Sequence, residues 1–384
     1  MKQTIVTILA ALLTISATAQ MKSEVSETVE LMGILSRTAG FEEFSGNFAG
    51  QYSKDAEAWF GQYREHPTVA YYKDLRARHG IGYERVTSMA VHLEADKGKV
   101  KLVGDRAELP GGWQNVDLDD FVKRLNKFYA DTRFHEFFEQ HKTFYNDFLK
   151  TYDANVMPHI HPEWFGRFYN GAETTERFRL IIGFTYGTTN NSASRQLPGQ
   201  PREVIAVCGY YINPSTGRHQ LDVSLPLHEF NHSFVNPLLD NADNAKAASK
   251  REQSDARIDY AEREQSRQNV KAMQDVGQKL FLLSQQSMES LHYNDWRIVV
   301  NESLVRAAVI AYFYEYGLNQ FAVNTLNIET MGNGFPWMLD AVAAIRYYAA
   351  HREQYPTLND FYSEIARCLG RYINDEAARA KKAS

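Results

Sequence analysis

The sequence contains only two cysteines among its 384 residues, Cys208 and Cys368. Two cysteines cannot form a zinc site built from cysteine ligands, nor the disulfide framework of a small secreted domain. Cys208 lies in the apolar segment VIAVCGYYI, where a free cysteine packs as a small hydrophobic residue. A disulfide between the two cysteines is the alternative, because an oxidising compartment would permit one.

The chain also has no excess of positively charged residues. The 42 Lys and Arg residues are outnumbered by 47 Asp and Glu residues, which gives a formal net charge of −5. Nucleic-acid-binding domains usually present a basic surface, so this composition argues against nucleic acid as the main partner. The hydrophobic content of 44%, with 22 Tyr and 22 Phe residues, predicts a packed globular core.

The chain has no apolar run of about 20 residues, the length that a helix needs to cross a bilayer. Its most marked apolar run covers residues 5–15, with Lys2 before it and the small-residue segment ATA after it. This order is typical of a secretory signal peptide cleaved near Ala19. We therefore expect residues 1–19 to be removed, and the mature chain to be periplasmic or secreted, with no membrane span.

Residues 20–170 have apolar positions mainly at helical spacing, and we expect a mostly helical N-terminal region there. Two runs rich in β-branched and aromatic residues follow, RFRLIIGFTYG at 177–187 and EVIAVCGYYI at 203–212. Both runs predict strands. The segment between them, TTNNSASRQLPGQPR, is rich in turn-forming residues and is expected to be a loop.

Helical patterns dominate again after the second of these strands. We expect one domain over residues 171–384, with a polar helical insertion around 241–290 and helices at its C-terminal end. The fold class predicted for the whole chain is therefore α+β and mainly helical.

The segment PLHEFNHSF contains a His-Glu-x-x-His motif formed by His228, Glu229 and His232. Ser224 is a candidate N-cap and Pro226 suits a first helical turn, so we expect the motif to lie on a helix. Residues four apart share one face of a helix, so both imidazoles can reach one metal ion. This is the ligand pattern of catalytic zinc sites in which the glutamate acts as general base.

A catalytic zinc ion needs a third protein ligand. A histidine ligand in the extended form of the motif would require Gly and His where this chain has Val235 and Leu238. The remaining common choice is a glutamate from a second helix, and Glu302 lies on the apolar seam of the segment IVVNESLVRAAVIAYFY. Three other glutamates lie in polar sequence or off this seam and are poorer candidates: Glu262, Glu264 and Glu315.

Arg306 follows Glu302 by one helical turn and allows two interpretations. In the first, the two side chains form a buried ion pair that needs no metal. In the second, Arg306 holds from behind a carboxylate that binds metal on its other side. The two interpretations are compatible, because both predict contact between Arg306 and Glu302.

The segment LHEFNHSFVNP, followed far downstream by NESLVRA, resembles the gluzincin metallopeptidases. It resembles more closely an exported bacterial domain family catalogued as of unknown function. The resemblance covers roughly residues 175–345 and is specific at these two motifs. It implies a zincin-like core: a small sheet, an active-site helix with His228, Glu229 and His232, and a second helix that delivers Glu302.

The chain departs from the well-known gluzincins in two respects. The interval between the second histidine and Glu302 is long, which predicts an inserted helical segment at the cleft. Arg306 stands where those enzymes often have an acidic residue, so a contact from a carboxylate to a ligand histidine is not expected there.

The resemblance also implies how a substrate would bind. Enzymes of this type hold the substrate backbone along an edge strand, for which the run 203–212 is the candidate. A phenol or imidazole usually stabilises the oxyanion beside the metal. Four tyrosines are candidates for that role: Tyr210, Tyr211, Tyr312 and Tyr316.

Taken together, the sequence predicts an exported zinc metallopeptidase that binds one Zn²⁺ per chain and acts on a peptide or protein. Two alternatives belong to other functional classes. One is a protein of the same fold that binds zinc and peptides without catalysis, and the other is a helical interaction protein in which the motif is coincidental. The presence of Glu229 favours the enzyme, because a protein without catalysis has no chemical need for that base.

Overall fold

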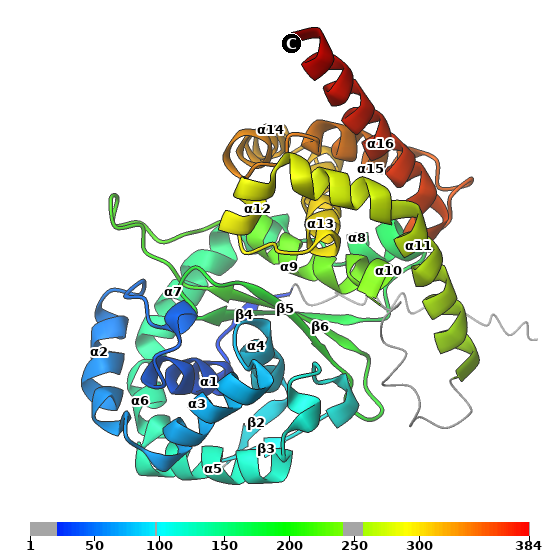
Figure 1. Cartoon of the computed structure of the whole chain (residues 1–384). Coiled ribbons are helices and arrows are strands. Elements are labelled where there is room, and N and C mark those ends of the chain that lie inside the picture. The colour runs from blue at the N-terminus through cyan, green and yellow to red at the C-terminus, as the bar shows by residue number, and fades with distance from the viewer. Residues whose placement is uncertain (1–20, 97, 241–255, 384) are drawn as a thin grey trace, which may run out of the picture.

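The computed structural model describes residues 21–96, 98–240 and 256–383 (Figure 1). The expected signal peptide therefore lies outside the described residues, as does the first part of the expected polar insertion. The fold is α+β and mostly helical, as the sequence predicts. Across the described ranges, we find no helix with both the length and the apolar character to cross a membrane.

A mixed four-stranded sheet lies at the centre of the fold, with the order β1-β4-β6-β5. Its strands are β1 (Ser23–Glu24), β4 (Arg177–Gly183), β6 (Glu203–Gly209) and β5 (Asn191–Arg195). β1, β4 and β6 are parallel, and β5 runs antiparallel to β6. β4 and β6 are largely buried, which explains why both are continuous apolar runs in the sequence.

Helices cover both faces of this sheet (Figure 1). One face is covered by helices of the N-terminal region, including α1 (Glu27–Thr38) and α4 (Glu84–Val91), and α4 packs against β5. The other face is covered by α9 (Ser224–Val235), which contacts β5 and β6. α13 (Trp296–Glu315) packs on α9 and forms the next layer.

The remaining elements surround these layers. In the N-terminal region they are α2 (Gln51–Phe60), α3 (Pro67–His79), β2 (Leu93–Asp96), β3 (Lys99–Leu102), α5 (Leu118–Asp131), α6 (Phe134–Gln140), α7 (Lys142–Asn155) and α8 (Glu163–Phe165). Short 3₁₀ or π turns are η1 (Glu42–Phe44), η2 (Gly61–Tyr63), η3 (Arg106–Glu108), η4 (Trp113–Asn115), η5 (Met157–His159) and η6 (Gly166–Asn170). The C-terminal elements are α10 (Pro237–Asp240), α11 (Ala256–Leu283), α12 (Gln285–Ser290), α14 (Asn319–Asn327), the π-helix η9 (Ile328–Gly332), α15 (Met338–Ala350) and α16 (Leu358–Ala383).

The sheet joins the two regions expected from the sequence. Its strand β1 belongs to the N-terminal region, and it pairs with β4 through Ser23 opposite Leu180 and Glu24 opposite Ile181. The boundary expected at residue 170 therefore crosses one continuous sheet, and buried side chains from both regions form one hydrophobic core.

The expectation of a loop between β4 and β6 is wrong in its central part, where β5 forms. The side chains of β5 alternate between buried and half-buried, and its last residue, Arg195, stands directly opposite Glu203 of β6. The Arg195 Nε–H donates to the Glu203 carboxylate at 2.6 Å. The polar sequence NSASR has little intrinsic strand preference, so this strand depends on its neighbour.

A second correction follows from the same pairing. The segment 203–212 was expected to be an edge strand, but β6 lies between β4 and β5 and is internal. The edge strand beside α9 is β5.

Both cysteines are free, in agreement with the reading of Cys208 as a packed hydrophobic residue. Cys208 is buried in β6, and Cys368 is partly buried in α16, where its thiol lies 3.6 Å from the Asp340 carbonyl oxygen.

Glu203 of β6 connects this strand with β4 and β5 and, through Arg195, with α4. Its carboxylate accepts hydrogen bonds from Arg195 of β5 at 2.6 Å and from Arg179 of β4 at 3.1 Å, and Arg195 also donates to the carbonyl of Val91 at the end of α4. We expect Glu203→Ala to lower the free energy of unfolding by about 3 kcal/mol or more, because it leaves buried Arg195 with only the distant carboxylate of Glu94, 4.0 Å away.

Denaturant titration measures this change. Asp275→Ala is the matched control, since it removes an exposed ion pair with Lys279 and should change stability by less than about 1 kcal/mol. Equal losses for the two variants would contradict the structural role given to Glu203.

Candidate metal centre

The helix α9 begins where its sequence allows the first backbone groups to be capped. The Asp222 side chain accepts hydrogen bonds from the Ser224 backbone N–H at 2.8 Å and from the Ser224 hydroxyl at 2.6 Å. Ser224 was expected to be the N-cap, but it is the first helical residue; Val223 takes the N-cap position without a side-chain hydrogen bond, and Asp222 just before it accepts from Ser224. Pro226 lies in the first turn as expected, and the helix ends before Pro237.

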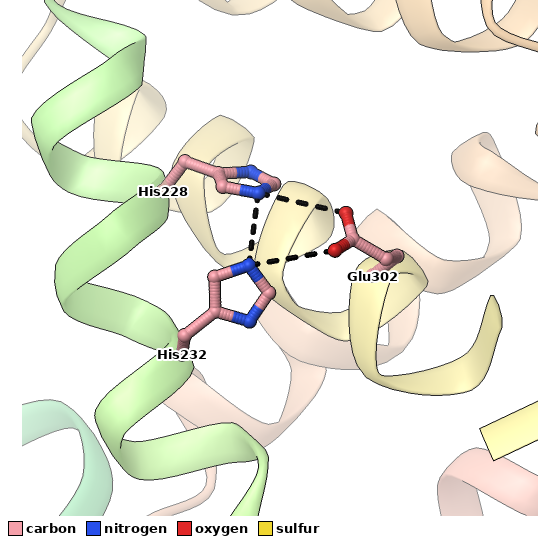
Figure 2. Close-up of side chains that lie close together, drawn as sticks. All are labelled: His228, His232 and Glu302. Atoms are coloured by element: carbon pink, nitrogen blue, oxygen red, sulfur yellow. Dashed lines mark hydrogen bonds and ion pairs between the residues drawn. The ribbon is translucent and has the colours of Figure 1, made fainter. Parts of the chain in front are cut away.

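The two histidines of the motif and Glu302 lie together, although they come from different helices. His228 and His232 extend from successive turns of α9, and the carboxylate of Glu302 faces them from α13 (Figure 2). The two Nε2 atoms are 3.0 Å apart. The Glu302 Oε2 atom is 3.5 Å from Nε2 of His228, and its Oε1 atom is 3.5 Å from Nε2 of His232.

These distances suit a metal ion. The donor atoms of the three residues all lie within 4.8 Å of one another. In a tetrahedral zinc site, with each donor about 2.0–2.1 Å from the ion, neighbouring donors are about 3.3 Å apart. The observed separations of 3.0, 3.5 and 3.5 Å lie on both sides of that value. Two imidazoles and a carboxylate are also the chemical donors that zinc binds in such sites.

The other ring nitrogen of His232 has a partner that favours metal binding. Its Nδ1 lies 3.0 Å from the side-chain oxygen of Asn236, one turn later on the same helix. An amide oxygen only accepts hydrogen bonds, so this contact favours the tautomer with a proton on Nδ1, in which Nε2 carries the lone pair that can bind a metal. An amide thus takes the place of the carboxylate that often contacts a ligand histidine.

Arg306 contacts Glu302 from behind, as the sequence predicts. Its Nη2 group donates to Glu302 Oε2 at 3.0 Å, and its Nη1 group donates to both carboxylate oxygens of Glu329 at 2.8 Å. The Nη2 group also donates to the hydroxyl of Tyr293 at 2.9 Å. Because Arg306 binds two carboxylates, its charge is balanced even when Glu302 shares its own charge with a metal.

Three residues of this site were not found from the sequence: Asn236, Tyr293 and Glu329. Asn236 could have been found, because it follows His232 by four residues and so faces the same side of the helix. Tyr293 lies in the connection before α13 and Glu329 in the π-helix η9, and no spacing in the sequence relates either of them to the motif.

The buried surroundings set the charges of the site. Burial alone would raise the pKa of Glu302, but the two imidazoles, Arg306 and a hydrogen bond from Tyr293 outweigh this and lower it to about 2. Burial lowers the pKa of His228 well below its usual range. At neutral pH the site therefore has an ionised carboxylate and a neutral imidazole at His228, the protonation states in which these groups bind metal.

Glu229 lies on the same helix and differs from Glu302 in its environment. Burial, supported by the nearby charge of Glu302, raises the pKa of Glu229 to about 7. Within the described residues, no protein group donates a hydrogen bond to its carboxylate, which lines the same cavity as the cluster. Its oxygens are therefore free to accept a proton near neutral pH.

The cluster opens into a cleft of about 1110 Å³. The loop after β4 and the start of β5 line one side, and the connection between α12 and α13, the helix α14 and η9 line the other. Residues of the N-terminal region, Tyr83 and Glu84, also line it. The cleft is thus built by all parts of the fold around the central sheet.

The four tyrosines expected as oxyanion partners do not line this cleft, so that expectation is wrong. Tyr312, for example, donates its hydroxyl hydrogen to the carbonyl of His159 at 2.7 Å, and Tyr210 bonds to the ring of His219 at 2.8 Å. Two other tyrosines line the cleft, Tyr83 and Tyr293, and Tyr293 is the one bonded to Arg306 beside the cluster.

The cluster predicts how metal content responds to mutation. We expect Glu302→Ala to reduce bound metal from about one ion per chain to a small fraction of that, because a charged ligand is lost. Elemental analysis of the purified chain measures this. Glu315→Ala is the control on the same helix: Glu315 accepts a hydrogen bond from Trp164 instead of facing the cluster, and its loss should leave the metal content unchanged. Equal metal content in the two variants would contradict a site at Glu302.

Comparison with known proteins gives one match. Residues 263–368 match a family model described as a domain of unknown function, DUF4932. The matched segment includes Glu302, Arg306, Tyr293 and Glu329, but not the helix α9 that carries the two histidines. No curated protein and no solved structure matches the chain.

Proposed function

We propose that this protein is a zinc-dependent peptide-bond hydrolase of the gluzincin type with a zincin-like core. The observation that carries the proposal is the convergence of His228, His232 and Glu302 at distances that suit a tetrahedral ion, beside a free carboxylate of raised pKa. In this proposal, the sheet and the helices α9 and α13 form that core.

Each residue has a chemical role in this proposal. A bound zinc ion would act as a Lewis acid and lower the pKa of an attacking water to about 7. Glu229 accepts the proton of that water and then passes it to the leaving amine. A pKa near 7 suits both steps, because the group must gain and lose a proton at neutral pH.

Tyr293 and Arg306 support the reaction in different ways. Arg306 keeps the Glu302 carboxylate directed at the two imidazoles, since it binds Glu302 on one side and Glu329 on the other. Tyr293 lines the cleft beside Glu302, to which its phenol is hydrogen-bonded. When zinc takes up the charge of that carboxylate, the phenol hydrogen would turn to a substrate carbonyl oxygen and stabilise negative charge there.

The edge strand β5 provides the place for a substrate backbone. Its first residues, Asn191 and Ser192, line the cleft, and among the described residues β5 pairs with β6 alone. An extended peptide can therefore add to β5 as a further strand, with its scissile bond directed at Glu229. A folded protein does not offer such a segment, so the expected substrates are peptides and unfolded polypeptides.

A protein that binds zinc and peptides without catalysis is the alternative. The free carboxylate of Glu229, with its pKa near 7, favours hydrolysis over that alternative, because binding alone requires no base in this position.

We also propose that the protein acts after export. A native preparation should contain a chain that starts at Gln20, because the apolar run at 5–15 and the following ATA form a cleavable signal. Intact mass measurement gives the answer, and a mature chain that keeps Met1 would contradict export.

The proposed base predicts a variant that separates binding from catalysis. We expect Glu229→Gln to retain zinc while hydrolysis of an unfolded polypeptide falls by about 10²–10⁴-fold, because the amide keeps the size of the side chain and cannot accept the proton. Zinc content and hydrolysis are measured together in the parent, in Glu229→Gln and in the Glu315→Ala control. If the parent is active and the Glu229→Gln variant equals it, Glu229 is not the base. A parent that binds zinc without hydrolysing unfolded polypeptide would favour the alternative without catalysis.

A further inference from the structure

Two strained residues lie on the wall of the cleft. Among the described residues, three that are not glycine have a positive backbone φ angle: Tyr83 at 47°, Arg133 at 52° and His292 at 63°. Glycine adopts this conformation without cost, whereas a residue with a Cβ atom does so only when the surrounding structure compensates. Tyr83 and His292 both line the cleft, and Arg133 does not.

The aromatic ring of Tyr83 contributes little to the packing of the protein. It immediately precedes α4 and is 48% exposed. Its backbone is held from behind, where the Tyr83 N–H donates to Glu43 at 3.1 Å and Glu43 forms a two-bond ion pair with Arg76. Internal contacts thus fix the strained backbone, and the aromatic side chain is presented to the cleft.

His292 repeats this arrangement on the other side of the cleft. It follows α12, where its N–H donates to the carbonyl of Glu289 at 3.0 Å and the next N–H, of Tyr293, donates to Met288 at 2.8 Å. Glycine is the usual residue at such a helix end. The imidazole of His292 is exposed, and within the described chain it has no hydrogen bond, ion pair or ring contact.

Arg133 has the same kind of strained backbone, but its side chain makes contacts within the protein. It lies in the turn between α5 and α6, where its guanidinium bonds to Glu136 at 3.1 Å and packs over the ring of Trp59. The side chain of Arg133 is used by the protein itself. Within the part of the chain that the structure describes, the imidazole of His292 has no such internal contact, and the ring of Tyr83 has only a distant contact with Arg76.

We propose that Tyr83 and His292 are substrate-contact residues at opposite rims of the cleft. The helices that adjoin them, α4 and α12, lie on opposite sides of the sheet (Figure 1), and both residues line the same cleft as Asn191 and Ser192 of β5. In this proposal, a chain added to β5 contacts both side chains. This inference rests on the proposed function. It adds that the N-terminal region takes part in substrate binding, although it lies outside the segment that matches the known family model.

Apolar residues on the side of the cleft that carries His292 indicate the class of substrate. Ile298, Phe321 and Ile328 line the cleft and are 40%, 41% and 57% exposed. Apolar side chains that remain exposed in a concave site mark a surface for apolar ligand groups. The favoured substrate is therefore an extended polypeptide segment with bulky apolar side chains, of the kind that folded proteins bury.

Binding can be measured without turnover in the Glu229→Gln background. The probe is a short fluorescent peptide with Leu and Phe side chains, and its dissociation constant is read by anisotropy. Into this background we introduce Tyr83→Gly, Tyr83→Ala, Tyr83→Phe, His292→Gly and, as the matched control, Arg133→Gly. Melting temperatures are measured for the same set.

We expect Tyr83→Gly and His292→Gly each to raise the dissociation constant about tenfold, the loss typical of an aromatic contact at a binding site. Tyr83→Phe keeps the ring and should bind like the parent background, and so should Arg133→Gly. Tyr83→Gly should melt at a higher temperature than Tyr83→Ala although both bind weakly, because only glycine removes the strain. A peptide with Ser in place of Leu and Phe should bind at least tenfold more weakly to the parent background.

The proposal is overturned if Tyr83→Gly and His292→Gly bind the peptide as tightly as Arg133→Gly does. It is also overturned, in its choice of substrate, if the Ser-containing peptide binds equally well. These outcomes are separate from the fate of the proposed hydrolysis. If the peptide binds as described and the parent does not cleave it, the contact residues stand and the catalytic proposal fails.

Discussion

The buried carboxylate of Glu302 is the constraint on which the site depends. A carboxylate buried between packed helices costs free energy unless several groups compensate its charge. Arg306 provides the opposite charge, Tyr293 a hydrogen bond, and the two imidazoles of α9 complete the surroundings. The packing of α13 on α9 is therefore tied to the chemistry of the cluster, since the groups that stabilise this charge also direct it at a metal position.

The same constraint extends into the parts of the fold that close the cleft. Arg306 binds Glu329 of η9 as well as Glu302, and its neighbour Tyr293 precedes α13 directly after the strained His292. The rim that presents His292 is thus connected through two hydrogen-bonded side chains to the carboxylate of the cluster. On the opposite side, β5 and the start of α4 bring the N-terminal region to the cleft. The central sheet connects these two sides, because α4 and α9 both pack on β5.

Local sequence predicts the helices of this protein well, because caps and periodic apolar positions act within one element. Pro67 opens α3, Gly40 follows α1 with φ of 78°, and the apolar runs of β4 and β6 form buried strands. β5 escaped prediction because its residues are polar and small. It exists through backbone pairing with β6 and through the Arg195–Glu203 ion pair, and both are contacts between distant parts of the chain.

The sequence by itself determined that His228 and His232 share one helical face with Glu229 beside them, since a spacing of four residues sets that geometry wherever the helix lies. It also singled out Glu302, because a lone carboxylate on an apolar seam needs a partner. Only the tertiary structure decided that the two helices face each other, that Tyr293 and Glu329 complete the polar network, and that β5 is the edge strand. These features depend on which surfaces pack together. The packing of the whole core decides this, and no local sequence pattern does.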